Sequence, residues 1–210
     1  ALVPLLLAGC SATDQVQYDL VYDAITLQAN DLEIGGIGFL TPSAATGREA
    51  DKQALAQNFA IKLQEMRPEI RVVPLPAILS AVNAADLYQQ YKNAYRDYLE
   101  TGILEGSILG CVGSVGNVRY LAQLSLAGFE QQSRGRFGIL GLRLIDTKQA
   151  NMRVFIQIWD SQTAAVAWEG STDMNYSYDT GREKPVTFHD VAQLAAEQLF
   201  ANLPGASDDS

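Results

Sequence analysis

The alternation of apolar and polar positions divides the chain into a front part with mixed patterns and a back part dominated by strand patterns. In the front part, the apolar stretch 32–40 predicts a strand, and the helical spacing of apolar residues over 49–66 predicts a helix. The short apolar run 70–74 predicts a second strand, which completes a strand–helix–strand unit. Two further helices are expected, from Pro76 to Val82 and from 84 to about 100.

The back part alternates between apolar and polar residues with the two-residue period of strands. The segment 160–163 has the composition of a hairpin turn, so the strands around it are expected to be antiparallel neighbours. A helix is expected over 188–203, where Pro204 and Gly205 end it. The strand candidates of this antiparallel meander are 119–130, 137–145, 152–159 and 164–174.

Together these elements predict a single α/β domain, in which helices pack on a mixed sheet and the C-terminal half of the chain forms an antiparallel meander. The domain is expected to span 18–203. Residues 1–9 are interpreted as the remaining part of a signal peptide, 10–17 as a lipid tether and 204–210 as a flexible tail.

The first residues indicate where the protein resides. An apolar run ends in Leu7, Ala8, Gly9 and Cys10, the order of the lipobox of bacterial lipoprotein precursors. The Cys10 thiol is the atom that would carry the diacylglycerol, and a palmitate is expected on the same residue. Because Ser11, and not an aspartate, follows the cysteine, we expect a lipid anchor in the outer membrane with the domain on the periplasmic side.

Composition and charge narrow the range of partners. The 48% apolar and 19% charged residues are ordinary for a folded protein. The 15 basic and 24 acidic residues give a net charge of −9, which repels phosphate backbones and makes nucleic acid an unsuitable partner. No polybasic segment is available for anionic lipid, so membrane attachment is expected to depend on the acyl chains of Cys10.

Residue types that carry chemistry are scarce in this sequence. If Cys10 is acylated, Cys111 has no disulfide partner, and its apolar surroundings predict a small buried side chain. His189 is the only histidine, so the usual ligand set for a zinc or haem site is missing. We therefore expect no cofactor, no metal and no enzymatic activity.

Four tyrosines share one face of the helix expected from residue 84, at i, i+3, i+7 and i+10. One interpretation is an amphipathic face that packs on the sheet with its hydroxyls at the rim. The other is a stripe that binds a partner, because tyrosine offers a large contact area at modest entropic cost. The four are Tyr88, Tyr91, Tyr95 and Tyr98.

The only dense basic spot consists of Arg134 and Arg136, which fall between two strand candidates. They are interpreted either as a solvated hairpin tip or as a contact for an anion or a glycan. Elsewhere Gly110, Gly113 and Gly116 recur every third residue, which gives a small-residue edge that lets another backbone approach closely.

The run 154–163, followed by 166–171, resembles the hairpin of periplasmic lipoproteins related to the curli-secretion lipoprotein and to the peptidoglycan-synthase activators. Shared features are a strand that ends at Asp160, a short turn with Thr163, and a strand containing Trp168. The order of elements over about 30–203 is also similar. This chain departs from the pattern at Ala164 and Ala165, where many relatives have a glycine in the turn.

The resemblance implies a non-enzymatic module that docks onto periplasmic or outer-membrane proteins or assembles with copies of itself. The sequence shows no long apolar hairpin of the kind that a secretion pore needs, which counts against channel activity. Two alternative hypotheses are a structural subunit of a larger envelope machine and an envelope enzyme that acts on glycan or lipid.

Overall fold

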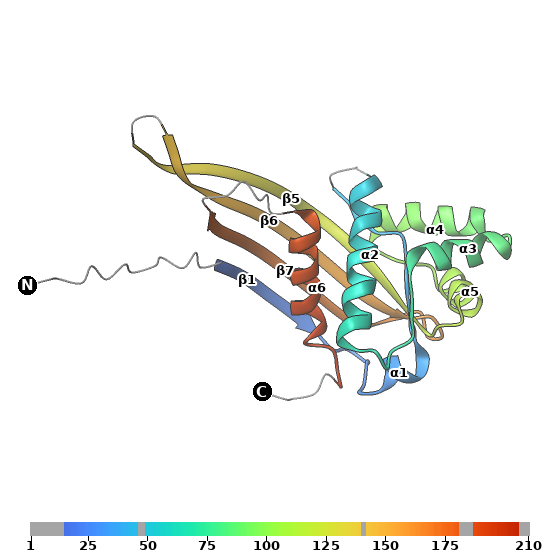
Figure 1. The fold of residues 1–210 in the computed structure, drawn as a ribbon. Helices are drawn as coiled ribbons and strands as arrows, with labels where there is room; N and C mark the ends of the chain where they lie inside the picture. Colours follow the sequence, from blue (N-terminus) through green and yellow to red (C-terminus); the bar gives the residue numbers. More distant parts are fainter. Residues whose placement is uncertain (1–14, 46–48, 140–141, 181–186, 206–210) are drawn as a thin grey trace, which may run out of the picture.

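The computed structural model describes residues 15–45, 49–139, 142–180 and 187–205 (Figure 1). For residue 15 and for 131–139, 142–148 and 178–180 it describes the path of the backbone alone. The predicted signal peptide, Cys10 and the predicted flexible tail beyond Gly205 lie outside the described residues.

A seven-stranded mixed sheet forms the middle of the fold, with the order β1-β7-β6-β5-β2-β4 and with β3 pairing with β5 off this path. Neighbours among β1, β7, β6 and β5 are antiparallel, whereas β2 runs parallel to both β5 and β4. The predicted fold class is thereby confirmed. The strands are β1 (Gln15–Asp23), β2 (Ile37–Phe39), β3 (Ser43–Ala44), β4 (Val72–Val73), β5 (Tyr120–Ile139), β6 (Leu142–Asp160) and β7 (Ala165–Thr180).

The described helices pack on both faces of this sheet (Figure 1). Successive residues of a strand point to opposite faces, so Tyr120 belongs to the core under α2 and α6, whereas Leu121 belongs to the core under α3, α4 and α5. The helices are α1 (Asp31–Gly35), α2 (Glu49–Met66), α3 (Leu75–Ala84), α4 (Tyr88–Thr101), α5 (Gly106–Gly116) and α6 (Phe188–Phe200). Among the described residues, no helix has both the length and the apolar character needed to cross a membrane.

The larger core lies between the sheet and the helices α2 and α6. Phe59 of α2 and Phe200 of α6 meet edge to face, with their ring centroids 5.5 Å apart, and neither is exposed. The bounds predicted for α2 are confirmed, as is the unit in which it connects two parallel strands. At the start of α6, the Thr187 hydroxyl accepts a hydrogen bond from the Asp190 N–H, and the Thr187 N–H donates to the Asp190 carboxylate.

The β5–β6 hairpin is much longer than predicted. We expected β5 to end near Glu130, but it continues to Ile139, which pairs with Leu142 at the start of β6. Register shifts between Leu126 and Gly128 and again after Gly135 let the glycines remain within a paired strand. The predicted strand 137–145 is therefore wrong, because its residues are divided between the end of β5 and the start of β6.

Two further predictions near the N-terminus differ from the structure. Residues Asp31–Gly35 form α1 and not a strand, because Gly36 takes a positive φ of 68° and ends a helical turn before β2 begins. The strand β1 begins at Gln15, inside the segment predicted as the tether. The N-terminal end of the sheet therefore starts directly after the predicted anchor.

Candidate functional site

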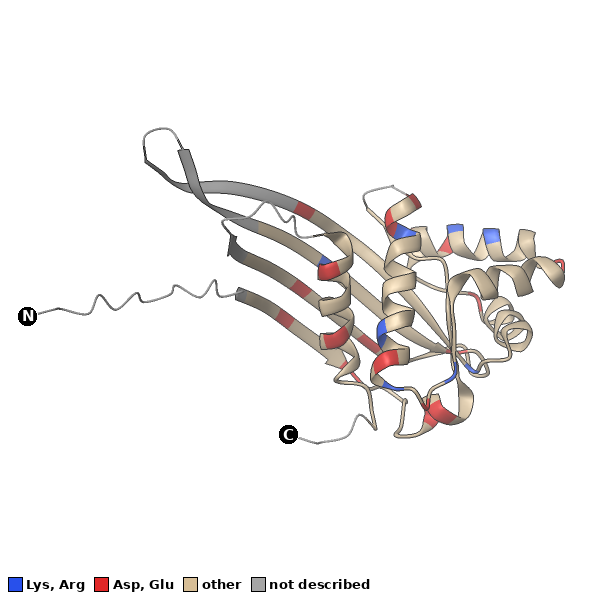
Figure 2. Cartoon of the chain, viewed as in Figure 1, with Lys and Arg blue, Asp and Glu red and all other residues tan. Residues whose placement is uncertain are grey.

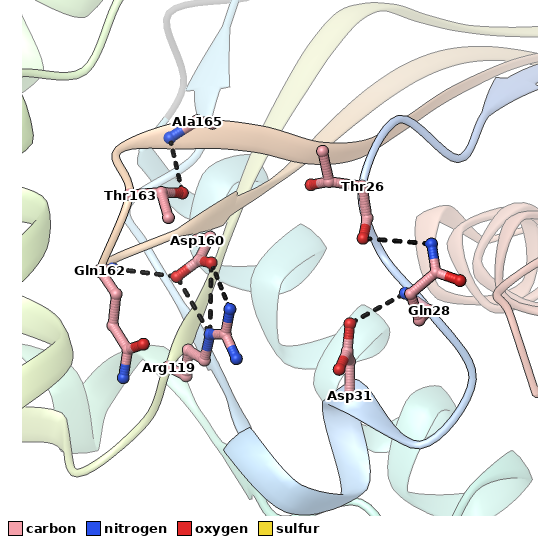
Figure 3. Close-up of polar contacts among 8 residues, drawn as sticks. All are labelled: Thr26, Gln28, Asp31, Arg119, Asp160, Gln162, Thr163 and Ala165. Atoms are coloured by element: carbon pink, nitrogen blue, oxygen red, sulfur yellow. Dashed lines mark hydrogen bonds and ion pairs between the residues drawn. The ribbon is translucent and has the colours of Figure 1, made fainter.

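The hairpin turn between β6 and β7, which carries the resemblance described above, is organised by one ion pair (Figure 3). The Asp160 carboxylate accepts hydrogen bonds from the Arg119 guanidinium, at 2.7 Å from Nη2 and 3.2 Å from Nε. It also accepts from the Gln162 N–H at 2.9 Å, which closes an Asx-type turn. The expected turn is confirmed, and Ala164 supplies the left-handed residue, with a φ of 58°, where a glycine is more usual.

The surroundings shift the pKa values of both members of this ion pair. Burial alone would raise the pKa of Asp160, but the hydrogen bonds from Arg119 and from the Gln162 N–H lower it below its usual value. Hydrogen bonding to Asp160 raises the pKa of Arg119. Both groups are therefore charged at neutral pH, and the pair connects the start of β5 to the end of β6.

The phenol of Tyr120 lies beneath this ion pair. The Arg119 guanidinium carbon lies 5.2 Å from the centre of the Tyr120 ring, which is almost fully buried. Burial raises the pKa of Tyr120 to about 12. The charge of Arg119 opposes this rise, whereas the nearby carboxylate of Asp31 adds to it. The phenol is protonated at neutral pH, and its contact with the Arg119 guanidinium gives this cluster a structural role.

The ion pair predicts a pH-dependent contribution to stability. Asp160→Asn should lower the free energy of unfolding at pH 7 by about 2 kcal/mol, because it removes charge-assisted hydrogen bonds from a buried carboxylate. The pKa of Asp160 is lower in the folded state, so its contribution is present above the unfolded value of about 4 and is lost as the pH falls below it. Urea titrations from pH 7 to pH 3 should show the two chains converging in stability.

Asp173→Asn is the matched control. Asp173 pairs with Arg153 on neighbouring strands, but the Arg153 side chain is 64% exposed. An exposed pair contributes about 0–1 kcal/mol, so this variant should change little at any pH. Equal losses in the two variants would contradict the role given to Asp160.

The structure places most of the predicted tyrosine face against the protein itself. Tyr98 is 7% exposed, and Tyr91 is partly buried against the core under α3, α4 and α5. The Tyr91 hydroxyl oxygen accepts a hydrogen bond from the Thr41 N–H at 2.9 Å, and the Tyr95 hydroxyl donates to the Pro42 carbonyl at 2.9 Å. Only Tyr88 is mainly in solvent, at 52% exposed. Partner binding by this face stays a prediction.

An apolar pocket lies between α4, α5 and the sheet, beside these two phenols. Its cavity volume is about 20 Å³, which leaves room for little more than a water-sized group. Burial raises the pKa of Tyr91, against hydrogen bonds from Thr41. The lining is largely apolar and consists of Leu40, Tyr91, Ala94, Tyr95, Leu104, Ile108, Leu109, Val112, Leu121 and Gln123.

The other residues singled out in the sequence have different positions from those expected. Arg134 and Arg136 lie within the backbone of β5 and not at a hairpin tip, and their side chains are outside the described residues. Cys111 is exposed, contrary to the prediction, because Leu109 and Val112 turn the other side of α5 toward the core. The His189 Nδ1 contacts the Asn58 side-chain oxygen at 2.5 Å, across the α2–α6 interface.

The strand β1 is a surface feature that the sequence analysis missed. It is an edge strand that pairs with β7, and in the described part of the chain no strand pairs with its other edge. Tyr18 is 46% exposed, Tyr22 50% and Val21 69%. An exposed edge strand with large apolar side chains is a template for pairing with another chain.

Within the described ranges, no group of three or more histidine, cysteine, aspartate or glutamate residues is arranged to hold a metal ion. No protein-family model and no curated protein matches this chain. The structure is similar to that of a PelC dodecamer subunit from Paraburkholderia phytofirmans, at 12% sequence identity over 91% of this chain and 100% of that chain, with a TM-score of 0.49.

A second similar structure is the lipoprotein GNA1162 from Neisseria meningitidis, at 10% sequence identity over 80% of this chain and 99% of that chain, with a TM-score of 0.40. Both TM-scores are below 0.5.

Proposed function

We propose that this protein is a lipid-anchored, non-enzymatic factor of the cell envelope that binds a periplasmic or outer-membrane protein through the free edge of β1. The observation that carries the proposal is the position of this exposed edge strand directly after the lipobox Leu7–Cys10. A partner strand that pairs with β1 would satisfy its outward N–H and C=O groups, and side-chain contacts would provide specificity.

The two faces of β1 differ in character. The cross-strand partners of Tyr18 and Tyr22 are Met174 and Gly170, so both phenols lie on the α6 side of the sheet. Asp19 lies on the opposite face beside Asp173, and Figure 2 shows that acidic residues recur on β1, β5 and β7. The aromatic face offers contact area to a partner, whereas the acidic face discourages uncontrolled edge-to-edge pairing.

The non-enzymatic part of the proposal is supported by the contacts of the chemically active side chains. His189 joins α6 to α2 through Asn58. Asp160 is engaged by Arg119 and by the turn that it closes. These contacts give both side chains a structural role.

The double variant Tyr18→Glu with Tyr22→Glu tests the binding surface. Recovery of the partner after crosslinking in intact cells should fall about tenfold or more, because two exposed aromatic contacts are replaced by charge. The free energy of unfolding should change by no more than about 0.5 kcal/mol per site, since both phenols are half in solvent.

Tyr88→Glu is the matched control, because Tyr88 is an equally exposed tyrosine on α4. The proposal predicts full recovery of the partner with this variant. Loss of the partner with Tyr88→Glu and retention with the double variant would move the binding surface to α4. A crosslinked product of twice the chain mass would identify the partner as a second copy.

A further inference from the structure

The distal part of the β5–β6 hairpin extends beyond the rest of the sheet. The strand β7 ends at Thr180, which pairs with Asp146 of β6. Farther along, β6 from Leu142 to Ile145 pairs with β5 alone in the described part of the chain. We define the hairpin extension as residues 137–139 and 142–145. It is a ribbon of two strands, too small to form a core of its own.

The composition of this extension contrasts with the rest of the chain. Five of its seven residues are large and apolar, which is unusual for a two-stranded ribbon outside a core: Phe137, Ile139, Leu142, Leu144 and Ile145. Over 133–148, which covers both strands of the hairpin beyond the Gln132–Gln149 pair, the sequence has one acidic residue, Asp146, although the whole chain carries a net charge of −9. The basic residues of this segment are Arg134, Arg136, Arg143 and Lys148. An apolar segment with an excess of basic residues within and beside it suits the boundary between anionic headgroups and acyl chains.

The extension lies at the same end of the sheet as the predicted anchor. Gln15 of β1 pairs with Ser177, Ser177 pairs with Gln149, and Gln149 pairs with Gln132, so these residues form one row across four strands. Figure 1 shows the start of β1 and the distal end of the β5–β6 hairpin on the same side of the molecule.

Beyond this row, the hairpin and the segment that leads back to Cys10 have comparable lengths. From Gln149 to Leu142 the hairpin rises about 23 Å, at about 3.3 Å for each residue. From Gln15 back to Cys10 the chain spans at most about 17 Å when fully extended. A lipid on Cys10 would therefore hold the sheet end close enough to the bilayer for the longer hairpin to meet it.

We propose that the hairpin extension docks into the surface of the membrane that holds the Cys10 acyl chains, as a second, non-covalent contact with anionic phospholipid. This contact fixes how the sheet is oriented over the bilayer and directs β1 to partners at a constant height. The position of the extension relative to the membrane rests on the proposed lipid anchor, whereas its apolar and basic composition does not.

Photocrosslinking of the full chain in intact cells tests this inference. A photoreactive phenylalanine analogue is placed at Phe137 or Ile139 in the extension, and at Gln162 in the exposed turn at the opposite end of the sheet. We expect phospholipid adducts at both extension positions at a yield at least about tenfold above that at Gln162. Combining Arg134→Glu with Arg136→Glu should lower the yield at Phe137 severalfold.

Protein adducts without lipid at Phe137 and Ile139, or no adducts at either position, would overturn the inference. The mass of the mature N-terminus is measured on the same samples. An acylated Cys10 without lipid adducts in the extension leaves the proposed function standing and removes only the docking contact. Lipid adducts on a chain without acyl groups would support docking and contradict the proposed anchor.

Discussion

Replacing Cys10 by serine should remove the lipid from the chain altogether. The thiol is the acceptor of the diacylglycerol, and a hydroxyl does not replace it in the lipobox Leu7–Cys10. We expect the variant to retain the residues before position 10 and to incorporate no labelled palmitate. Because each buried CH₂ contributes about 0.8 kcal/mol to membrane binding, losing the acyl chains removes the largest attachment that the sequence offers.

Cys111→Ser is the matched control for this experiment, because Cys111 is the only other cysteine. It lies exposed on α5, so the substitution should leave both lipid incorporation and folding intact. Mass spectrometry of the mature N-terminus distinguishes the outcomes. An unmodified Cys10 in the natural chain, or equal labelling of both variants, would contradict the anchor.

Gly113→Ala should destabilise the domain by on the order of 3 kcal/mol, reduced in part by the better helix propensity of alanine. A Cβ at this position would lie 2.3 Å from the Ser161 Oγ and 2.9 Å from the Val118 carbonyl oxygen. Neither neighbour moves easily, because Ser161 belongs to the turn held by the Arg119–Asp160 pair and its N–H donates to the Arg119 carbonyl. Urea denaturation would measure the loss.

Gly110→Ala is the control on the same helix, because no loss of stability is expected there. Its Cβ would lie 3.6 Å from the Ser161 carbonyl oxygen, which is ordinary van der Waals contact. Alanine is favoured over glycine in a helix by about 1 kcal/mol, so this variant should be as stable as the natural chain or more stable. Similar effects at both glycines would show that α5 does not pack on the turn as described.

The elements that the sequence predicted well are those with a strong local pattern. The helix α2 was predicted with its bounds because its apolar residues recur at helical spacing and Pro68 follows its end. The turn after Asp160 was predicted because Asp, Ser and Thr are turn residues whose side chains bond to nearby backbone groups. In both cases residues close in sequence determine the conformation.

The features that were missed depend on residues far apart in sequence. The segment around Val16 was interpreted as part of a polar tether, and it is a strand because β7 provides a partner more than a hundred residues later. Likewise, the length of the β5–β6 hairpin depends on bulges that pairing with β6 stabilises, which no pattern within β5 reveals.

At the candidate sites, too, local patterns were predicted correctly and contacts between distant segments were missed. Helical spacing correctly placed the four tyrosines on one face, but it could not indicate that the Thr41–Pro42 segment would cover Tyr91 and Tyr95. Cys111 was expected in the core because its sequence neighbours are apolar, yet on α5 those neighbours occupy the inward side. Spacing predicts which residues share a face, whereas tertiary contacts decide what that face meets.

Contact between β1 and another envelope protein in the cell is the central element of the proposed function. Photocrosslinking from Tyr18 in intact cells, followed by isolation of the chain and mass spectrometry of the adducts, measures this contact. We expect a specific adduct with a periplasmic or outer-membrane protein, or with a second copy, that is absent from the same experiment at Tyr88. A chain that forms no protein adduct at Tyr18, while a purified sample converts a glycan or lipid substrate, would contradict the proposed function.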